Sequence, residues 1–152
     1  MADRVALDDI SKHLVSLLQK DGRMSYAAMA AEVGLSEAAV RHRVAKLLDG
    51  GVVQVVAVTD PLQLGFPRQA MIGVTVSSDV RKVAAEIAEV AEVDYVVITA
   101  GRFDILAEIV AESDDNLLDI VASRIIDLPG VASTETFMYL KLEKQTYAWG
   151  VR

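Results

Sequence analysis

The sequence predicts an α+β chain in two parts: a helical N-terminal part, residues 1–59, and a sheet-based C-terminal part, residues 68–152. Apolar residues recur at helical spacing in three segments before residue 50. From residue 68 onward, β-branched apolar runs and helical patterns follow the order strand, helix, strand, strand, helix, strand. Residues 60–67 contain two prolines and a glycine, which indicates a linker between the parts. A surface loop inside a single domain is the alternative for this segment.

The composition excludes several classes of function. The 152 residues are 53% hydrophobic but only 5% aromatic, so aliphatic side chains and alanine build the core. The chain has no cysteine, which excludes disulfides and thiolate metal sites. Its two histidines, His13 and His42, are too few and too scattered for a metal site, so we expect neither metal nor cofactor. Without an apolar signal region or a run long enough to span a membrane, we expect a cytoplasmic protein with no membrane partner.

Three helices are predicted in the N-terminal part. The first opens at Asp8–Asp9 and ends at the turn Asp21–Gly22–Arg23. The second is capped by Ser25 and stops at Gly34, because glycine accepts a left-handed backbone without a steric clash. The third is capped by Ser36. Their predicted buried stripes are Ile10, Leu14, Leu17 and Leu18; Met29, Ala30 and Val33; and Val40, Val44, Leu47 and Leu48.

The second and third helices, joined by a tight turn, predict a helix-turn-helix. The outward stripe of the third helix holds Ala38, Arg41, His42 and Ala45, flanked by Glu37 and Lys46. Small side chains permit close approach to another surface, and Arg and His supply donors, as a helix that enters a DNA major groove requires. A strand predicted over residues 52–58 would complete a winged helix-turn-helix. The alternative is a helical hairpin whose polar face is only solvated.

The C-terminal part predicts a ferredoxin-like βαββαβ domain. Its strands are expected at residues 71–76, 95–100, 105–111 and 131–142, and its helices begin after Ser78–Asp79 and Ser113. The second helix should bury Leu118, Val121, Ala122 and Ile125. Both helices cover one face of the antiparallel sheet, yet Phe137 and Tyr139 point to the other face. That face is too apolar for water, so a second copy of the chain is expected to cover it.

Several motifs together resemble the Lrp/AsnC family of bacterial and archaeal transcription regulators, over nearly the whole chain. They are Leu7–Asp8, Asp21–Gly22–Arg23, Val33–Gly34–Leu35–Ser36, Val40, Arg43, Leu47 and Gly51–Val52–Val53. The resemblance implies a sequence-specific regulator that binds double-stranded DNA, responds to an amino acid, and forms homodimers that assemble to an octamer. Ser11 departs from the aspartate that is usual in the family, at a position that supports the first helix.

The residues expected to contact DNA lie on or beside the predicted third helix. They are Ser25, Tyr26, Ser36, Glu37, Ala38, Arg41, His42, Arg43 and Lys46. Ser25 and Ser36 should lie near phosphates. For His42 a base or phosphate contact and a solvated side chain are both open, and Arg43 has the alternative of pinning the third helix to its domain.

The net charge of −7 is unusual for a DNA-binding protein, but it is unevenly distributed. Residues 1–59 contain 7 Lys and Arg against 7 Asp and Glu, whereas residues 60–152 contain 8 against 15. A neutral DNA-binding part predicts modest affinity per subunit, because neutralisation of phosphates supplies most non-specific binding. Several subunits on one DNA would compensate through effective concentration.

The turn at residues 101–104 is the candidate effector site of the second part. By its resemblance to the G-x-x-D turn of the family, it is expected to bind a zwitterion between neighbouring dimers. The expected effector residues are Gly101, Arg102, Phe103, Asp104, Thr134 and Thr136. The alternative is a plain hairpin turn in which Gly101 supplies a positive φ. Phe103 departs from the tyrosine often found there in the family, so the effector's identity stays open.

Enzymatic activity is not expected. There is no nucleophile elbow, and no histidine follows residue 42 to activate a serine. Siroheme decarboxylases resemble this family in both domains, but they use histidine and basic residues in the second half, which is acidic here. Low-specificity DNA compaction remains a second function to be distinguished. The tail, residues 144–152, either packs on a partner subunit or is a frayed end.

Overall fold

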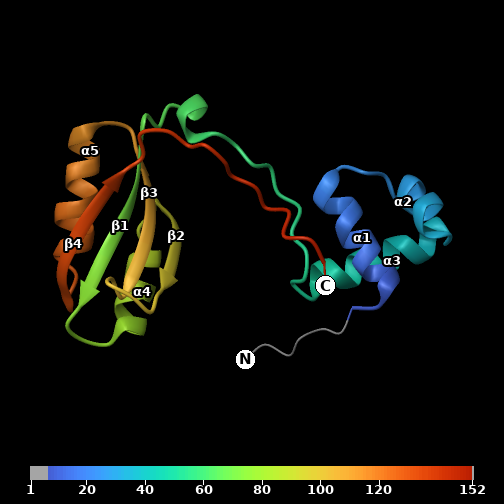
Figure 1. Ribbon diagram of the computed structural model, residues 1–152, viewed down its shortest axis with the longest axis horizontal. Helices are drawn as coiled ribbons and strands as arrows, with labels where there is room; N and C mark the ends of the chain where they lie inside the picture. The colour runs from blue at the N-terminus through green and yellow to red at the C-terminus, as the bar shows by residue number, and fades with distance from the viewer. Residues whose placement is uncertain (1–6, 152) are drawn as a thin grey trace. The chain divides into compact units, whose positions relative to one another are not determined.

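The computed structural model describes residues 7–151 (Figure 1). The chain divides into a helical unit, Met1–Val58 with Lys144–Arg152, and a sheet unit, Thr59–Glu143. We expected the tail to belong to the second part, but it belongs to the helical unit. Val151 packs against the helical core, and residues 146–149 line a cavity together with residues of the first helix and of the segment that follows the third helix. Of these tail residues only Val151 is partly buried, whereas Tyr147 and Trp149 are 56% and 86% exposed.

The helical unit consists of α1 (Asp9–Lys20), α2 (Tyr26–Val33) and α3 (Glu37–Asp49). Each helix begins where a side-chain oxygen accepts a backbone N–H: Asp8 from Ser11, Ser25 from Ala28, and Ser36 from Ala39. Gly34 ends α2 with φ 68°, so the predicted left-handed cap is confirmed. The core consists of Leu14, Val15, Leu17, Met29, Ala30, Val40, Val44 and Leu47.

The strand expected at residues 52–58 is absent from the structure, which describes this whole segment as irregular. Val55, Val56 and Val58 are 51%, 70% and 62% exposed. A strand requires a neighbour for its backbone hydrogen bonds, and within residues 7–151 no segment pairs with this one. The prediction of a wing was therefore wrong for the single chain, although the helix-turn-helix itself is confirmed.

The sheet unit follows the predicted order. After a short 3₁₀ turn, η1 (Pro61–Leu64), come β1 (Arg68–Val76), α4 (Val80–Ala88), β2 (Val93–Ile98) and β3 (Ile105–Ala111). Then α5 (Asp114–Asp119) continues into the π-helix η2 (Ile120–Ile126), and β4 (Val131–Met138) ends the unit's regular structure. The strands lie in the order β2-β3-β1-β4 and all pairs are antiparallel. The ferredoxin-like arrangement is confirmed.

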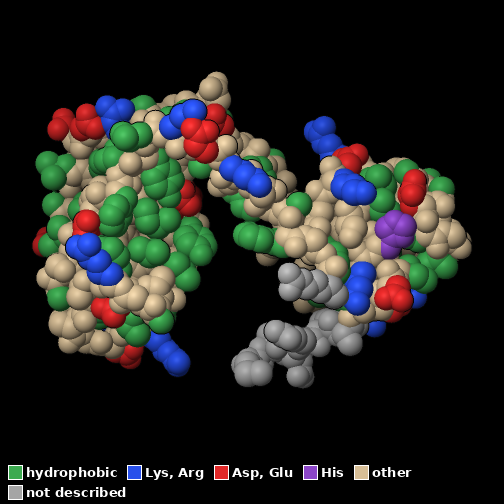
Figure 2. All heavy atoms as spheres, in the orientation of Figure 1, with side chains coloured by type: hydrophobic (Ala, Val, Ile, Leu, Met, Phe, Trp, Pro, Cys, Tyr) green, Lys and Arg blue, Asp and Glu red, His purple; other side chains and the backbone are tan. Residues whose placement is uncertain are grey.

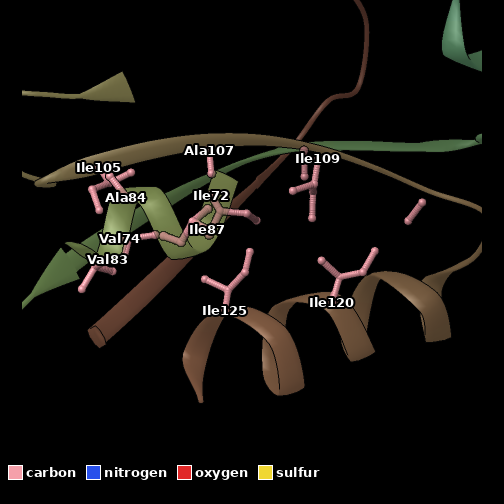
Figure 3. Packing of buried hydrophobic residues seen from close by; sticks show 12 residues of the cluster. Ile72, Val74, Val83, Ala84, Ile87, Ile105, Ala107, Ile109, Ile120 and Ile125 are labelled. Carbon is pink, nitrogen blue, oxygen red and sulfur yellow. The ribbon is translucent and has the colours of Figure 1, made fainter. Parts of the chain in front are cut away.

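The core of the sheet unit lies between one face of the sheet and the helices (Figure 3). Ile72, Ile105 and Ile109 on the strands are fully buried, as are Ile120 and Ile125 on η2. The predicted stripe of the second helix was wrong in one respect, because Leu118 is 66% exposed. The π-helical turn changes the period, and residues five apart, such as Ile120 and Ile125, then share one face.

Within the described part of the sheet unit, no helix covers the opposite face of the sheet, here called the open face. Its residues follow from the strand register: Met71, Gly73, Tyr95, Val97, Leu106, Glu108, Glu135 and Phe137. Hydrophobic side chains gather over the middle of the sheet in Figure 2. Tyr95 and Phe137 are 51% and 41% exposed. The last strand ends at Met138 rather than at residue 142, after which Leu140 is 97% exposed.

Candidate nucleic-acid interface and ligand-binding turn

The outward face of α3 carries the residues predicted for DNA. Val40 and Val44 are buried in the helical core, which fixes the rotation of α3. Ala38, Arg41, His42 and Lys46 are consequently exposed on the other side. Ser36 uses its side-chain oxygen to cap α3, with Oγ 3.2 Å from the Ala39 nitrogen, and its hydroxyl hydrogen stays available for an acceptor.

Arg41 is held in place by two neighbours. Its Nη2 lies 2.8 Å from the Glu37 Oε1, and its guanidinium carbon lies 4.8 Å from the centre of the Tyr26 ring. The cation–π contact ties the second turn of α3 to the first residue of α2. The Arg41 side chain is still 62% exposed, so the guanidinium is positioned without being covered.

Arg43 points elsewhere. Its Nη1 donates to the Asp8 carboxylate at 2.6 Å and to the Ser11 hydroxyl at 3.3 Å, and so joins α3 to the start of α1. Hydrogen bonds from the side chain and backbone of Ser11, followed by that from Arg43, lower the pKa of Asp8 to about 2. Of the two roles considered for Arg43, the structure supports the pin between helices.

Six of the predicted DNA-contact residues thus gather around the exposed side of α3, and the N-cap Ser25 and Tyr26 lie at the start of α2. Arg43 is the exception, since its side chain faces α1. Sequence analysis missed Asp8 as the partner of Arg43. The position of Asp8 as the cap of α1 marked it as a structural carboxylate. Its partner could not be read from the sequence, because Arg43 lies 35 residues away in the chain.

The turn between β2 and β3 is fixed by its own backbone. The Thr99 N–H donates to the Asp104 carbonyl, and the Asp104 N–H donates to Val74 on β1. The Asp104 Oδ2 accepts the N–H of Val76 at 2.8 Å. One carboxylate oxygen of Asp104 is therefore committed to the fold, which leaves the other for any ligand.

Phe103 and Arg102 reach across β1 to β4 on the open face. The Phe103 ring lies directly on Gly73, where even a Cβ would come within 2.7 Å of the ring. The ring meets Phe137 edge to face, with 5.8 Å between the ring centres. Arg102 donates to the Glu135 Oε2 at 2.8 Å. Sequence analysis missed both Gly73 and Glu135, although an isolated glycine within a strand signals close approach of another group.

Two details of the turn differ from expectation. Gly101 does not have a positive φ, contrary to the plain-hairpin alternative, and nothing lies within 4 Å of the place where its Cβ would be. Thr134 and Thr136 pair with Val74 and Ile72, and so lie on the helix-covered face. The structure does not bring them together with Arg102 and Phe103 within one chain, because a strand alternates its side chains between faces. Their part in effector binding stays a prediction.

A second polar group lies toward the other end of the open face. Gln69 donates to the Glu108 carboxylate at 2.8 Å. Burial, with the charge and hydrogen bond of Glu108 acting in the same direction, raises the pKa of Tyr139 to about 12. Between Glu108 and the Arg102–Glu135 pair the face is apolar, so its polar groups border a central hydrophobic area.

Other kinds of site find no support in residues 7–151. Within this range the structure has no group of three or more His, Cys, Asp or Glu side chains that could hold a metal ion. None of the helices in the same range is both long and apolar enough to span a membrane.

The sequence was compared with models of known families. Residues 7–48 match the AsnC-type helix-turn-helix domain. Residues 67–152 match the AsnC transcriptional-regulator domain described as a C-terminal dimeric alpha+beta barrel. The chain belongs to the Lrp/AsnC family of transcriptional regulators. The predicted resemblance is thereby confirmed along both parts of the chain.

Relatives of this Lrp/AsnC regulator cover nearly its whole length. An uncharacterized HTH-type transcriptional regulator of Pyrococcus furiosus is 35% identical, over 93% of this chain and 97% of its own. A proline dehydrogenase transcriptional activator of Rhizobium radiobacter is 30% identical, over 92% and 93%. The structure of a Neisseria meningitidis transcriptional regulator in complex with L-Met has TM-score 0.81 and 26% identity, covering 93% and 94%. These relatives are regulators of transcription, not enzymes.

Proposed function

We propose that this protein binds specific sequences of double-stranded DNA through α3 and that an amino acid or a similar small zwitterion regulates this binding. The observation that carries the proposal is the exposed face of α3, where small side chains surround the positioned guanidinium of Arg41. The complex of a structural neighbour with L-Met supports the choice of effector class.

Each group on the α3 face has a distinct task in this proposal. Arg41 has a guanidinium that can pair bidentately with guanine O6 and N7 in the major groove. Ser25 and Ser36, together with the positive ends of α2 and α3, lie where phosphates would be bound. His42 and Lys46 extend the donor surface toward the middle of α3, while Ala38 lets the helix approach the bases.

The proposed regulator works as an assembly. Residues 1–59 have equal numbers of acidic and basic side chains, so one helical unit gains little from general phosphate attraction. Two or more copies on neighbouring half-sites would add their affinities through effective concentration. We place the dimer contact on the open face and propose further assembly to an octamer, in line with the family domain described as dimeric.

Selection of DNA from a random pool tests this function. The wild-type protein should enrich a defined motif, and Arg41→Ala should weaken binding to it by ~1–3 kcal/mol, about 5- to 150-fold. Arg81→Ala, which removes an exposed arginine from α4 in the sheet unit, is the control and should bind normally. A pool that stays random while the protein binds DNA would instead establish low-specificity DNA organisation. Unchanged motif affinity in Arg41→Ala would remove Arg41 from the recognition surface.

A further inference from the structure

Two side chains from different helices hold the guanidinium of Arg41. Tyr26, the first residue of α2, places its ring centre 4.8 Å from the guanidinium carbon, and Glu37, the first residue of α3, places Oε1 2.8 Å from Nη2. In the described part of the chain, His42 and Lys46 on the same face of α3 form no ion pair and no side-chain hydrogen bond. Of these three basic side chains, Arg41 is therefore the one whose head group is fixed in the free protein.

The ring that contacts Arg41 is itself anchored. Tyr26 is half-buried and packs against the core of the helical unit. Its place in the chain is set by Ser25, which caps α2 with Oγ 3.1 Å from the Ala28 nitrogen. At the other end of the contact, Val40 is fully buried and fixes the backbone next to Arg41. The arginine side chain is thus held at its base and at its head by residues of the helical core.

We infer that Tyr26 is a positioning residue for sequence recognition: its ring orients the Arg41 guanidinium toward a base, and Tyr26 acts on DNA through Arg41. This inference rests on the proposed binding of specific DNA sequences. A long arginine side chain loses conformational freedom when it pairs with a base, and this loss weakens binding. A guanidinium that already lies against an anchored ring has given up much of that freedom in the free protein, so less is lost on binding.

The two contacts leave the guanidinium able to bind a guanine. Attraction to the Tyr26 ring comes from the positive charge of Arg41 and uses none of its N–H donors. Glu37 accepts from Nη2, while Nε and Nη1 carry further N–H donors. Guanine O6 and N7 take parallel hydrogen bonds from such a group in the major groove. The ring contact and the base contact can therefore exist at the same time.

Positioning affects specific and non-specific binding differently. In specific binding, Arg41 must meet the acceptors of one base at a defined distance and angle, so a fixed guanidinium raises the affinity. In non-specific binding, phosphates attract the charge of arginine with little demand on its orientation. Removal of the Tyr26 ring leaves the charge of Arg41 in place. The loss should therefore appear in the affinity for the selected motif and not in the affinity for random DNA.

A double-mutant cycle on the full chain separates this role from general packing. Fluorescence anisotropy measures binding to a duplex with the motif that the wild type selects and to a duplex of random sequence. Tyr26→Leu should weaken binding to the motif about three- to tenfold and change binding to the random duplex by less than about twofold. In the Arg41→Ala background, Tyr26→Leu should have almost no further effect, because the group that it positions is gone. Tyr26→Phe keeps the ring and should bind as the wild type does.

The selected sequences give a second readout with a matched control. Arg41→Ala should lose the preference for guanine at one position of the motif, and Tyr26→Leu should relax the preference at that same position. Val33 lies at the other end of α2 and, like Tyr26, packs half-buried against the helical core. Val33→Ala should lower the unfolding temperature and keep the guanine preference. An equal relaxation in Val33→Ala would assign the effect to loosened packing and overturn the inference.

The remaining outcomes separate this inference from the function on which it rests. An equal effect of Tyr26→Leu with and without Arg41 would overturn the inference. The same holds if Tyr26→Phe loses as much affinity for the motif as Tyr26→Leu, because the hydroxyl and not the ring would then be responsible. In both cases the motif selected by the wild type still supports the proposed function. If the wild type selects no motif, the proposed function falls and this inference falls with it.

Discussion

The two units differ in whether a single chain completes them. In the helical unit, three helices bury one another's apolar stripes, and the outward face of α3 is built from small and polar side chains. In the sheet unit, the helices cover only one face, while Tyr95 and Phe137 stay about half exposed on the other. A polar surface that faces water or DNA is stable in a single chain, whereas an apolar sheet face requires a partner to cover it.

Charge follows the same division. The helical half is balanced, with 7 basic and 7 acidic residues before residue 60, and the remainder of the chain carries the whole net charge of −7. An acidic sheet unit does not compete for DNA phosphates. Contact with DNA is therefore expected of the helical unit and assembly of the sheet unit, and substitutions in each unit can test this division.

The largest effects are expected from cavities in the two cores. Leu14→Ala in the helical unit and Ile72→Ala in the sheet unit each remove a fully buried side chain. Each should lower the free energy of unfolding of its own unit by about 2–5 kcal/mol. Calorimetric unfolding measures the loss of stability in each variant. Light scattering should show that Leu14→Ala leaves the assembly state intact while Ile72→Ala weakens it. Equal loss of assembly in both variants would contradict independent units.

A charge on the open face should break assembly without unfolding the chain. Leu106 lies at the middle of this face, opposite Gly73 and Val97. Leu106→Glu should weaken self-association by roughly 2 kcal/mol or more, because a desolvated carboxylate would have no partner there. Light scattering measures the mass, and circular dichroism checks the fold. Ala85→Glu on the exposed side of α4 is the control, and a mass that falls equally in both would argue against this interface.

The pin between α1 and α3 should make the helical unit sensitive to acid. The pKa of Asp8 in the folded chain is about 2, below its ordinary value of 3.8, so its contribution to stability is complete only above about pH 4. As the pH falls from about 4 toward 2, this contribution is lost, because the unfolded chain takes up the proton first. Thermal unfolding of wild type and Asp8→Asn should differ at pH 5, and the difference should shrink steadily as the pH falls to about 2. A difference that persists unchanged at low pH would exclude the Asp8 charge as its source.

The smallest change concerns Arg43. Arg43→Ala should lower the unfolding temperature of the helical unit by a few degrees and weaken DNA binding only as far as α3 loosens, since its side chain faces Asp8. Arg41→Ala should instead weaken DNA binding and leave the unfolding temperature nearly unchanged, because the exposed ion pair of Arg41 contributes little to stability. Unfolding and DNA-binding measurements on the same two proteins separate the roles. Loss of DNA affinity in Arg43→Ala at full stability would place Arg43 on the DNA instead.

Local features of this chain were readable from its sequence. Ser25, Ser36 and Gly34 act within their own helix ends, so a few neighbouring residues determine them. The order of strands and helices in the sheet unit followed for the same reason, because each element has its own apolar period. The DNA-contact stripe of α3 was predicted because Val40 and Val44 determine which side of the helix is buried.

Features that depend on distant partners were not readable. The segment at residues 52–58 has the composition of a strand, but composition does not supply a neighbouring strand. Leu118 was misplaced because the helix changes to a π-helical period at Ile120. The partner of Arg102 is Glu135, 33 residues away, and only the strand register of β1 and β4 brings it near.

The most direct test of the division between the units is the mass of the wild-type protein in solution. Sedimentation velocity at micromolar concentration should show particles at an even multiple of the 16.4 kDa chain, because a second copy covers the open face. A single species of 16.4 kDa at that concentration would contradict the account, since Tyr95, Leu106 and Phe137 would then stay in water.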